Sequence, residues 1–450
     1  FQDLGYLRKD GSKATAVIKK RVALAFGASE PCGACSGTAK VPSEKTGKPI
    51  NCKACGASGL TLDGTRVPRT PTGGIDTGRD VLLESGDEDL LEFEAYTARD
   101  KVLSTYVPWL ERGAPLKPNP LLVTGRASCG TAQTIPGDMG IRNCVVARPG
   151  TALISCDYAA LELATHAQSC IWLLPDVHCA LAHAINSGVK VHDLLGAQMA
   201  GLDYETFLER RLAGDKYCND IRQAAKAANF GFPGGMGVVT FVLAKRKDSV
   251  RTGKYKGIRF CMLIGGEEDC GKEMVTTYKR REYPPVCLRC IECVEDLKRN
   301  WFDTWTENRP YFKLIGEDVD RGYIVQHKSN RVRGGVSFTS AANGYFQGLA
   351  SDGAKLALCR VAREQWCEPD SALYGSRAIL FAHDEIIMEA PLAKVNDAAM
   401  RLKLVMEEAM REYVPDVAIE AEPAAMLRWS KKAQPVFNEK GELIPWIPNK

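Results

Sequence analysis

Three side chains in the segment from Arg222 to Gly237 have types and spacing that suit a phosphorylated ligand. Arg222, Lys226 and Phe230 recur every four residues in an Ala-rich stretch, so they project from one face of an expected helix. The two cations could bind phosphates, and the ring could stack near a base or a sugar. A surface helix with an incidental basic stripe has the same pattern.

Two other segments place a carboxylate at the end of an apolar strand. Residues 151–157 predict a buried strand that ends at Asp157, and residues 378–389 predict a hairpin whose tip holds Asp384. Acids among β-forming residues are costly to bury unless a positive charge balances them. Two carboxylates on one sheet could hold two Mg²⁺ ions for an in-line phosphoryl displacement. The simpler alternatives are a helix N-cap at Asp157 and an ordinary charged turn at Asp384.

Cysteine spacing predicts metal sites. The chain has 17 cysteines, several of them in Cys-x-x-Cys pairs, which fits a reducing compartment better than a disulfide framework. Two pairs have the separation of a structural four-thiolate zinc site, with chance pairing as the alternative: Cys32, Cys35, Cys52 and Cys55. A looser set could form a second zinc site: Cys261, Cys270, Cys287 and Cys290.

The composition is that of a globular protein with two or three domains, at 450 residues, 45% apolar and 25% charged. Residues 245–281 hold eleven Lys or Arg against five Asp or Glu, which indicates a phosphate-rich partner or a solvated insert. No transmembrane run and no signal peptide is visible, so we expect no membrane partner and a cytoplasmic location. Because the chain begins with Phe1, any upstream sequence is unseen.

A mixed framework of helices and strands must position these residues. Hydrophobic periodicity and helix breakers predict a basic helical segment at 1–30, helices at 88–109, 160–215, 294–320 and 392–413, a helix that starts at Asn343–Asp352, and a polar tail. A polar, Gly-containing loop is expected at 123–136.

Four motifs, taken together and in this order, resemble those of the family A DNA polymerases. Thr124-Gly-Arg126 with Gln133-x-Ile-Pro136 resembles the segment of that family that binds the template and primer. The others resemble motif A (Asp157-Tyr-x-x-Leu-Glu162-Leu), motif B (Arg222-x3-Lys226-x3-Phe230-Gly) and motif C (His383-Asp384-Glu385). Asn343, Gln347 and Asp352 fit the segment before motif C, and the resemblance covers roughly residues 85–430, apart from an insert near 245–290.

The resemblance implies a role for each of these residues. Asp157 and Asp384 would bind two Mg²⁺ ions with help from the Tyr158 carbonyl, and Glu385 would support the metal site. Glu162 would close off the 2′ side of the sugar and so favour deoxynucleotides. Arg222, Lys226 and His192 would hold the triphosphate, and Phe230 would pack on the incoming nucleotide. The primer or template would contact Arg126, Gln133, Asn343, Gln347 and His383.

The same resemblance implies the right-hand polymerase fold, an α/β (α+β) architecture with an antiparallel palm sheet, helical fingers and a thumb, here with zinc-ribbon-like inserts. We expect part of the thumb at 1–110 with an insert at 30–60, the palm at 111–164 and 346–450, and the fingers at 165–345 with a Cys-rich basic insert at 245–293. The implied activity is template-directed addition of deoxynucleotides to a primer 3′ end in DNA replication, with duplex DNA and deoxynucleoside triphosphates as partners.

The sequence departs from the family pattern in several places. Motif B usually ends in Tyr-Gly, with the tyrosine near the templating base, but Gly234 stands there, after Pro233, which should end the helix. Ala159 and Ala160 replace polar residues of motif A. The two Cys-rich inserts are unusual for the family and suggest a phage or other divergent lineage. No acidic exonuclease motif precedes Cys32, so a proofreading domain would lie upstream of Phe1 or be absent.

Two other functions compete with this interpretation. A single-subunit RNA polymerase shares the palm, but Glu162 and Phe230 disfavour it, and a comparison of ribonucleotide with deoxyribonucleotide incorporation would separate the two. A zinc-dependent nucleic-acid-binding module is the other, because the first cysteine set resembles the Cys-x-x-Cys-x-Gly-x-Gly repeats of certain chaperones. In such a module the aspartates would be dispensable, whereas zinc removal would abolish binding.

Overall fold

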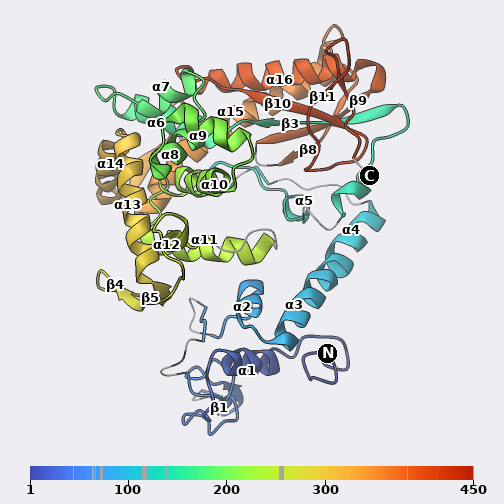
Figure 1. Cartoon of the computed structure of the whole chain (residues 1–450). Coiled ribbons are helices and arrows are strands. Elements are labelled where there is room, and N and C mark those ends of the chain that lie inside the picture. Colours follow the sequence, from blue (N-terminus) through green and yellow to red (C-terminus); the bar gives the residue numbers. More distant parts are fainter. Residues whose placement is uncertain are drawn as a thin grey trace. The chain divides into compact units, whose positions relative to one another are not determined.

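The structure is a computed structural model that describes residues 1–43, 45–62, 65, 67–70, 74–113, 119–120, 122–136, 140–252, 258–382 and 384–448. His383, predicted to contact the primer or template, lies outside these residues. The chain, coloured by residue number in Figure 1, divides into two compact units. The first comprises Phe1–Pro108 and Val238–Val294, and the second comprises Trp109–Gly237 and Glu295–Lys450. None of the helices in the described ranges combines the length and hydropathy of a bilayer-spanning segment.

The first unit has a small apolar core that joins its N-terminal helices. Ile18 and Val22 of one helix pack with Leu90 and Phe93 of another, and all four side chains are buried. The elements of this unit are α1 (Thr15–Ala25), β1 (Lys40–Pro42), β2 (Pro49–Asn51), α2 (Arg79–Glu84), α3 (Glu88–Lys101), the π-helical turn η1 (Val102–Tyr106), α11 (Val238–Thr252), α12 (Phe260–Leu263), β4 (Met274–Tyr278) and β5 (Arg281–Cys287). Two helices cross the boundary between the units: α4 (Val107–Arg112) and α13 (Leu288–Thr304).

The helix predicted at 88–109 is confirmed as a run from Glu88 to Arg112 with a π-helical turn inside it. It begins after Asp87, whose carboxylate accepts a hydrogen bond from the Leu90 backbone N–H at 3.1 Å. Such an N-cap satisfies one of the amide groups that the first helical turn leaves without a partner.

A four-stranded antiparallel sheet is the centre of the second unit. Its order is β10 (Ala421–Met426), β3 (Thr151–Tyr158), β9 (Glu385–Pro391) and β8 (Arg377–Ala382). The predicted strand at 151–157 and the predicted hairpin at 378–389 are therefore both confirmed. In the register of β3 and β9, Cys156 lies opposite Ile386, so the end of β3 lies beside the start of β9. Helix α16 (Val395–Arg411) lies along β10 and β3 (Figure 1).

The second unit also contains helices and helical turns that precede and follow the strands of this sheet in the chain. They are α5 (Gly130–Gln133), η2 (Arg142–Cys144), α6 (Leu161–Leu173), α7 (Ala180–Asn186), α8 (Val191–Ala200), α9 (Tyr204–Leu212), α10 (Lys216–Gly231), α14 (Asn308–Arg321), α15 (Phe338–Cys367) and η3 (Leu392–Lys394). Short strand pairs complete the unit: β6 (Tyr323–Val325) with β7 (Val332–Gly334), and β11 (Val436–Phe437) with β12 (Leu443–Ile444).

Two predictions about the C-terminal half are wrong. The helix expected to start at 343–352 begins earlier, at Phe338, because Ser337 and Ser340 form a capping box that fixes its first turn. The tail expected to be only polar contains β10, which pairs with β3 along its full length. Its Ala-Glu-Pro-Ala-Ala-Met sequence has few β-forming residues, so pairing with β3 decides its conformation.

Candidate active site

The three predicted acids meet at one end of the sheet. Asp157 is the second-last residue of β3, Glu385 is the first residue of β9, and Asp384 directly precedes it. Asp157 does not cap the next helix: Ala160 occupies that position in a left-handed conformation with φ 50°. This tight turn lets helix α6 begin at Leu161, so that Glu162 follows the strand closely.

Burial and neighbouring carboxylates raise the pKa values of both aspartates. Desolvation by the surrounding protein, followed by the charges of Asp384 and Glu385, raises the pKa of Asp157 to about 6. This shift arises although more than a third of the Asp157 surface is exposed. The pKa of Asp384 is raised as well, first by desolvation. Both carboxylates would lose this repulsion if a cation lay between them.

Glu385 differs from the aspartates because it has fixed partners. Ser155 Oγ donates a hydrogen bond to its Oε1 at 2.5 Å, and Lys431 Nζ lies 2.8 Å from its Oε2. Lys431 also lowers the pKa of Asp157. These two contacts hold the glutamate in place at the same end of the sheet as the aspartates, and its supporting role stays a prediction.

Arg126 and Glu162 form an ion pair next to these acids. About 30% of each side chain is exposed. Arg126 lowers the pKa of Asp384, whereas Glu162 raises it, so both groups act electrostatically on the same carboxylate. Tyr158 directs its hydroxyl away from this group, donating to the Met406 carbonyl at 2.7 Å.

Helix α10 presents the predicted basic face. Asp215 caps its first turn by accepting from the Cys218 backbone N–H at 3.1 Å, and the helix ends at Gly231, two residues before Pro233, as predicted. Lys226 lies over the Phe230 ring, 5.9 Å from its centroid. The helical spacing therefore places these two side chains together, as expected.

A buried carboxylate that was not predicted lies behind this face. Asp193 of α8 has no exposed side-chain surface and lies 3.0 Å from Arg222 Nε and 2.8 Å from Arg211 Nε. The N–H groups do not point squarely at the carboxylate, so these contacts are ion pairs rather than aligned hydrogen bonds. One negative charge faces two guanidinium groups and leaves an excess of positive charge, to which Lys226 adds.

His192 joins the basic face from α8. Its ring lies 5.3 Å from that of Phe230, centroid to centroid. Burial, together with the positive charges of Arg222 and Lys226, lowers its pKa to about 4. The imidazole is therefore neutral at physiological pH.

Gly234, where the resemblance to motif B predicts a tyrosine, lies against Asn343 of α15. A Cβ at Gly234 would lie 2.5 Å from Asn343 Nδ2, which is too close for any real contact. Asn343 is held there by donating to the carbonyls of Gly234 and Thr339, at 3.1 and 2.7 Å. Gln347 donates to Asn343 Oδ1 at 3.3 Å, so the two predicted DNA-contacting side chains form one chain of hydrogen bonds.

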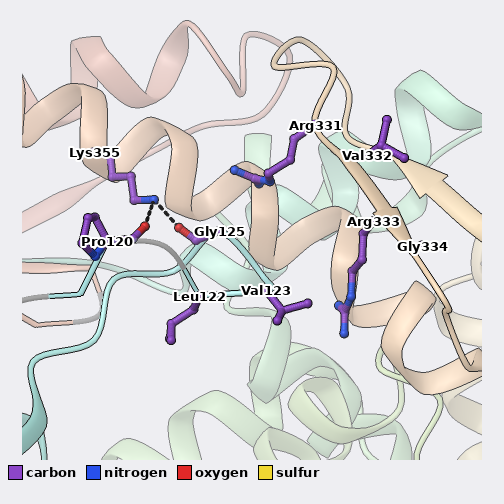
Figure 2. A pocket seen from close by; sticks show the side chains of 9 residues that line it. All are labelled: Pro120, Leu122, Val123, Gly125, Arg331, Val332, Arg333, Gly334 and Lys355. Carbon is purple, nitrogen blue, oxygen red and sulfur yellow. Dashed lines mark hydrogen bonds between the residues drawn. The ribbon is translucent and has the colours of Figure 1, made fainter.

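Figure 2 shows a pocket of about 370 Å³ beside the loop that precedes Arg126. Three cations line it, and each has a structural partner. Lys355 donates to the carbonyls of Pro120 and Gly125, Arg331 pairs with Asp352 at 2.7 Å, and Arg333 donates to the Ser340 carbonyl at 2.9 Å. The two Lys355 hydrogen bonds fasten the loop that precedes Arg126 to α15. Gln133, on α5, points back to this segment and donates to the Ala127 carbonyl at 3.3 Å.

A family model described as DNA polymerase family A matches residues 69–431. The chain belongs to this family. It is 27% identical to DNA polymerase I of Deinococcus radiodurans over 342 residues, which cover 68% of this chain and 29% of that protein. It is 26% identical to DNA polymerase I of Lactococcus lactis subsp. lactis over 377 residues, which cover 76% of this chain and 35% of that protein. The chain thus spans about a third of the length of the curated relatives it matches.

A solved structure has the same fold. It is the POL domain of Pol1 from M. smegmatis in complex with DNA primer-template and dNTP. The TM-score is 0.57 at 19% identity, over 81% of this chain and 58% of that chain. The predicted polymerase fold is therefore confirmed.

This family A chain brings both predicted cysteine sets together in its first unit. In each set of four, the sulfur atoms lie within 4.8 Å of one another. In the first set, Cys35 Sγ lies 3.8 Å from Cys55 Sγ. The turns that follow these two cysteines are in close contact, because a Cβ at Gly59 would lie 2.4 Å from the Gly37 carbonyl oxygen. All four of these cysteines are buried.

The second cysteine set is assembled from α12, the following loop, β5 and α13. Cys261 Sγ lies 3.3 Å and Cys270 Sγ 3.6 Å from Cys290 Sγ. Burial raises the pKa of Cys261 to about 12, as it raises that of Cys32 to about 11, so without a metal these two thiols stay protonated at neutral pH. Four converging sulfur atoms are the ligand set of a tetrahedral metal site.

Sequence reasoning missed Asp193 and Lys431, although each contacts a predicted site residue. Asp193 left a weak signal, since it is an acid directly after His192 in an otherwise apolar helical segment. Lys431 lies 46 residues after Glu385 in a polar segment and left no local signal.

Proposed function

We propose that this chain is the polymerase part of a template-directed DNA polymerase that adds deoxynucleotides to a primer 3′ end. The main support is the pairing, within one unit of a family A chain, of an acidic sheet edge with a basic helix face. Burial and neighbouring carboxylates raise the pKa of both aspartates of the edge, and the basic face has more positive than negative charge. A magnesium-bound nucleoside triphosphate would complement both.

The acidic edge fits the magnesium ions that the family implies. Asp157 and Asp384, with the Tyr158 carbonyl, would hold two Mg²⁺ ions, and oxygen ligands of this kind suit that cation. The ions would supply charge stabilisation for the attacking and leaving oxygens. Ser155 and Lys431 would keep Glu385 in place, and so keep the aspartates aligned.

The basic face would bind and orient the nucleotide. Arg222, Lys226 and His192 would hold the triphosphate, Lys226 would neutralise charge that develops during transfer, and Phe230 would pack on the nucleotide. Glu162 would lie at the 2′ side of the sugar, held there by Arg126. The structural neighbour was solved with a DNA primer-template and a dNTP, which supports these partners.

DNA contacts would come from Arg126, Gln133, Asn343, Gln347 and His383. The sheet of β10, β3, β9 and β8 would be the palm, helices α8–α10 would belong to the fingers, and residues 1–110 would include part of the thumb. The remaining predicted boundaries, the cytoplasmic location and the phage-like lineage stay predictions.

Primer extension with Mg²⁺ tests this function, with dNTPs and rNTPs compared on the same template. We expect extension with dNTPs, little with rNTPs, and none with dNTPs by the Asp384→Ala variant. Extension that persists in the variant would overturn the metal site, and a preference for rNTPs would favour an RNA polymerase. If the chain binds duplex DNA but extends nothing, the proposed activity is wrong for this chain.

We also propose that both cysteine sets bind structural zinc. Four thiolates leave no open coordination position, which suits a structural ion. Metal analysis should find two zinc ions per chain and one in each of the variants Cys35→Ser and Cys270→Ser. Chelation should expose residues 30–62 to amide exchange and weaken duplex binding. A chain purified without zinc that retains the same exchange protection would contradict this proposal.

A further inference from the structure

Asn229 is the centre of a buried hydrogen-bond network between α8, α10 and α13. Only 1% of the residue is exposed. One of its side-chain amide atoms lies 3.1 Å from Trp301 Nε1 and 2.9 Å from Trp305 Nε1. An indole N–H can only donate, so the atom that faces both rings must be the carbonyl oxygen, Oδ1. The two tryptophans thus settle the orientation of the amide on chemical grounds.

The other end of the Asn229 amide must then be the nitrogen, which only donates. Nδ2 lies 3.2 Å from the Val191 carbonyl and 3.2 Å from His192 Nδ1. The carbonyl accepts one hydrogen, and the ring nitrogen must accept the other. His192 Nδ1 therefore has a lone pair and no proton. Because the pKa of His192 is lowered to about 4, the neutral ring has its one proton on Nε2.

We propose that Asn229 is a positioning residue that fixes His192 in the Nε2–H form, so that the ring presents a donor to a phosphate of the incoming nucleotide. This inference rests on the proposed function, in which His192 holds the triphosphate. The opposite tautomer would direct a lone pair at a phosphate oxygen and repel it. Arg222 and Lys226 supply charge on the same face, and the neutral histidine adds a directional hydrogen bond.

The tautomer can be observed directly by NMR on the protein labelled with ¹⁵N-histidine. The chain has six histidines, and the His192 signals are those that disappear in His192→Gln. We expect Nδ1 to have the shift of an unprotonated ring nitrogen and Nε2 that of a protonated one. In Asn229→Asp the carboxylate still accepts from both tryptophans but cannot donate, so Nδ1 should become protonated. A protonated Nδ1 in the unsubstituted protein would overturn the proposal.

Two substitutions of His192 distinguish between two roles of its side chain: donating a hydrogen bond to a phosphate, and only packing within the protein. The amide nitrogen of glutamine reaches the position of Nε2, whereas an asparagine side chain reaches only that of Nδ1. His192→Gln keeps a donor toward the phosphate and loses the contact with Asn229, and His192→Asn does the reverse. We expect the Kd for Mg·dNTP, measured by calorimetry, to rise less than threefold in the first variant and about tenfold in the second, the loss of one charge-assisted hydrogen bond.

The opposite ranking, or equal losses, would show that His192 serves only the packing and would overturn the proposal. These readouts do not depend on catalysis. If primer extension fails while the NMR and binding results hold, the proposed polymerase activity is wrong and the histidine assignment stands. If extension succeeds and neither variant changes the Kd, His192 does not contact the triphosphate.

Discussion

The acidic sheet edge and the basic face of α10 belong to the same unit but treat charge in opposite ways. At the edge, burial and neighbouring carboxylates raise the pKa values of Asp157 and Asp384, and Lys431 contacts Glu385. On the basic face, Asp193 already balances part of the charge of Arg222. A bound cation would reduce the repulsion between the carboxylates of the edge. On the helix face, Asp193 balances part of the positive charge before any ligand binds, and it also holds Arg222 in place.

This difference has a physical reason. A divalent cation is small and binds only where carboxylates converge, so some repulsion before binding is unavoidable. A triphosphate is larger and is recognised by direction as well as by charge, so cations held by a buried counter-ion lose less freedom on binding. The substitutions below test the two regions separately.

Loss of a carboxylate should have the largest effect. Asp157→Ala should lower the rate of primer extension about 10³-fold or more, because one acid cannot hold two metal ions. Duplex DNA binding, measured by gel shift, should not change. Asp176→Ala, an exposed acid in a turn, is the control and should be fully active. An active Asp157→Ala would remove the acidic edge from the mechanism.

Loss of a cation on the helix face should have a smaller effect. Lys226→Ala should lower kcat/KM for a dNTP about 10²-fold, because the triphosphate loses one neutralising charge. The matched control on the same helix is Lys216→Ala, which removes an exposed lysine paired with Asp220 at 2.5 Å. Equal losses in the two variants would show that only the general charge of α10 matters.

Removing Glu162, which lies beside the acidic edge, should change selectivity rather than rate. Glu162→Ala should raise ribonucleotide incorporation relative to deoxynucleotide incorporation about tenfold, since the space beside the 2′ carbon opens. Competition assays with one rNTP and its dNTP measure the ratio. Glu422→Ala, an exposed acid on β10 opposite Asp157, is the control. If the ratio stays constant in Glu162→Ala, another group excludes ribonucleotides.

The smallest effect concerns stability in metal-free buffer. The folded-state pKa of Asp157, about 6, lies above its ordinary value, so the native state binds more protons between about pH 4 and pH 6. Stability from this group is present below that window and is lost as the pH rises through it. Asp157→Asn should therefore raise the free energy of unfolding by about 1 kcal/mol at pH 8 and leave it unchanged at pH 4. The value at pH 8 is reduced because solvent screens the partly exposed carboxylate. Urea titrations at both pH values measure it; an equal gain at both would contradict the charge repulsion.

Features that repeat within one element could be predicted from the sequence. The spacing of Arg222, Lys226 and Phe230 predicts that they share one face of a helix. Each Cys-x-x-Cys pair predicts a local turn that brings its two sulfur atoms together. The two apolar runs that flank the charged turn at Asp384 predicted the hairpin that the structure has. In each case a local rule determines the geometry, so no knowledge of distant contacts is needed.

Features that depend on pairing between distant elements could not be predicted. Asp193 meets Arg222 from another helix, and Asn229 meets Trp301 from 72 residues away. Strand β10 forms only because β3 offers it a partner. Both Trp301 and Trp305 are buried, but their hydrogen bonds to one amide had no signal in the sequence.

The contact between Gly234 and Asn343 limits how this chain can evolve. A tyrosine at position 234, the usual family residue, would have to displace an asparagine side chain that is held by two hydrogen bonds. The two positions therefore form an epistatic pair, in which a change at 234 is tolerated only after a smaller residue has appeared at 343. The order of substitutions therefore matters, because a larger residue at 234 needs a change at 343 first.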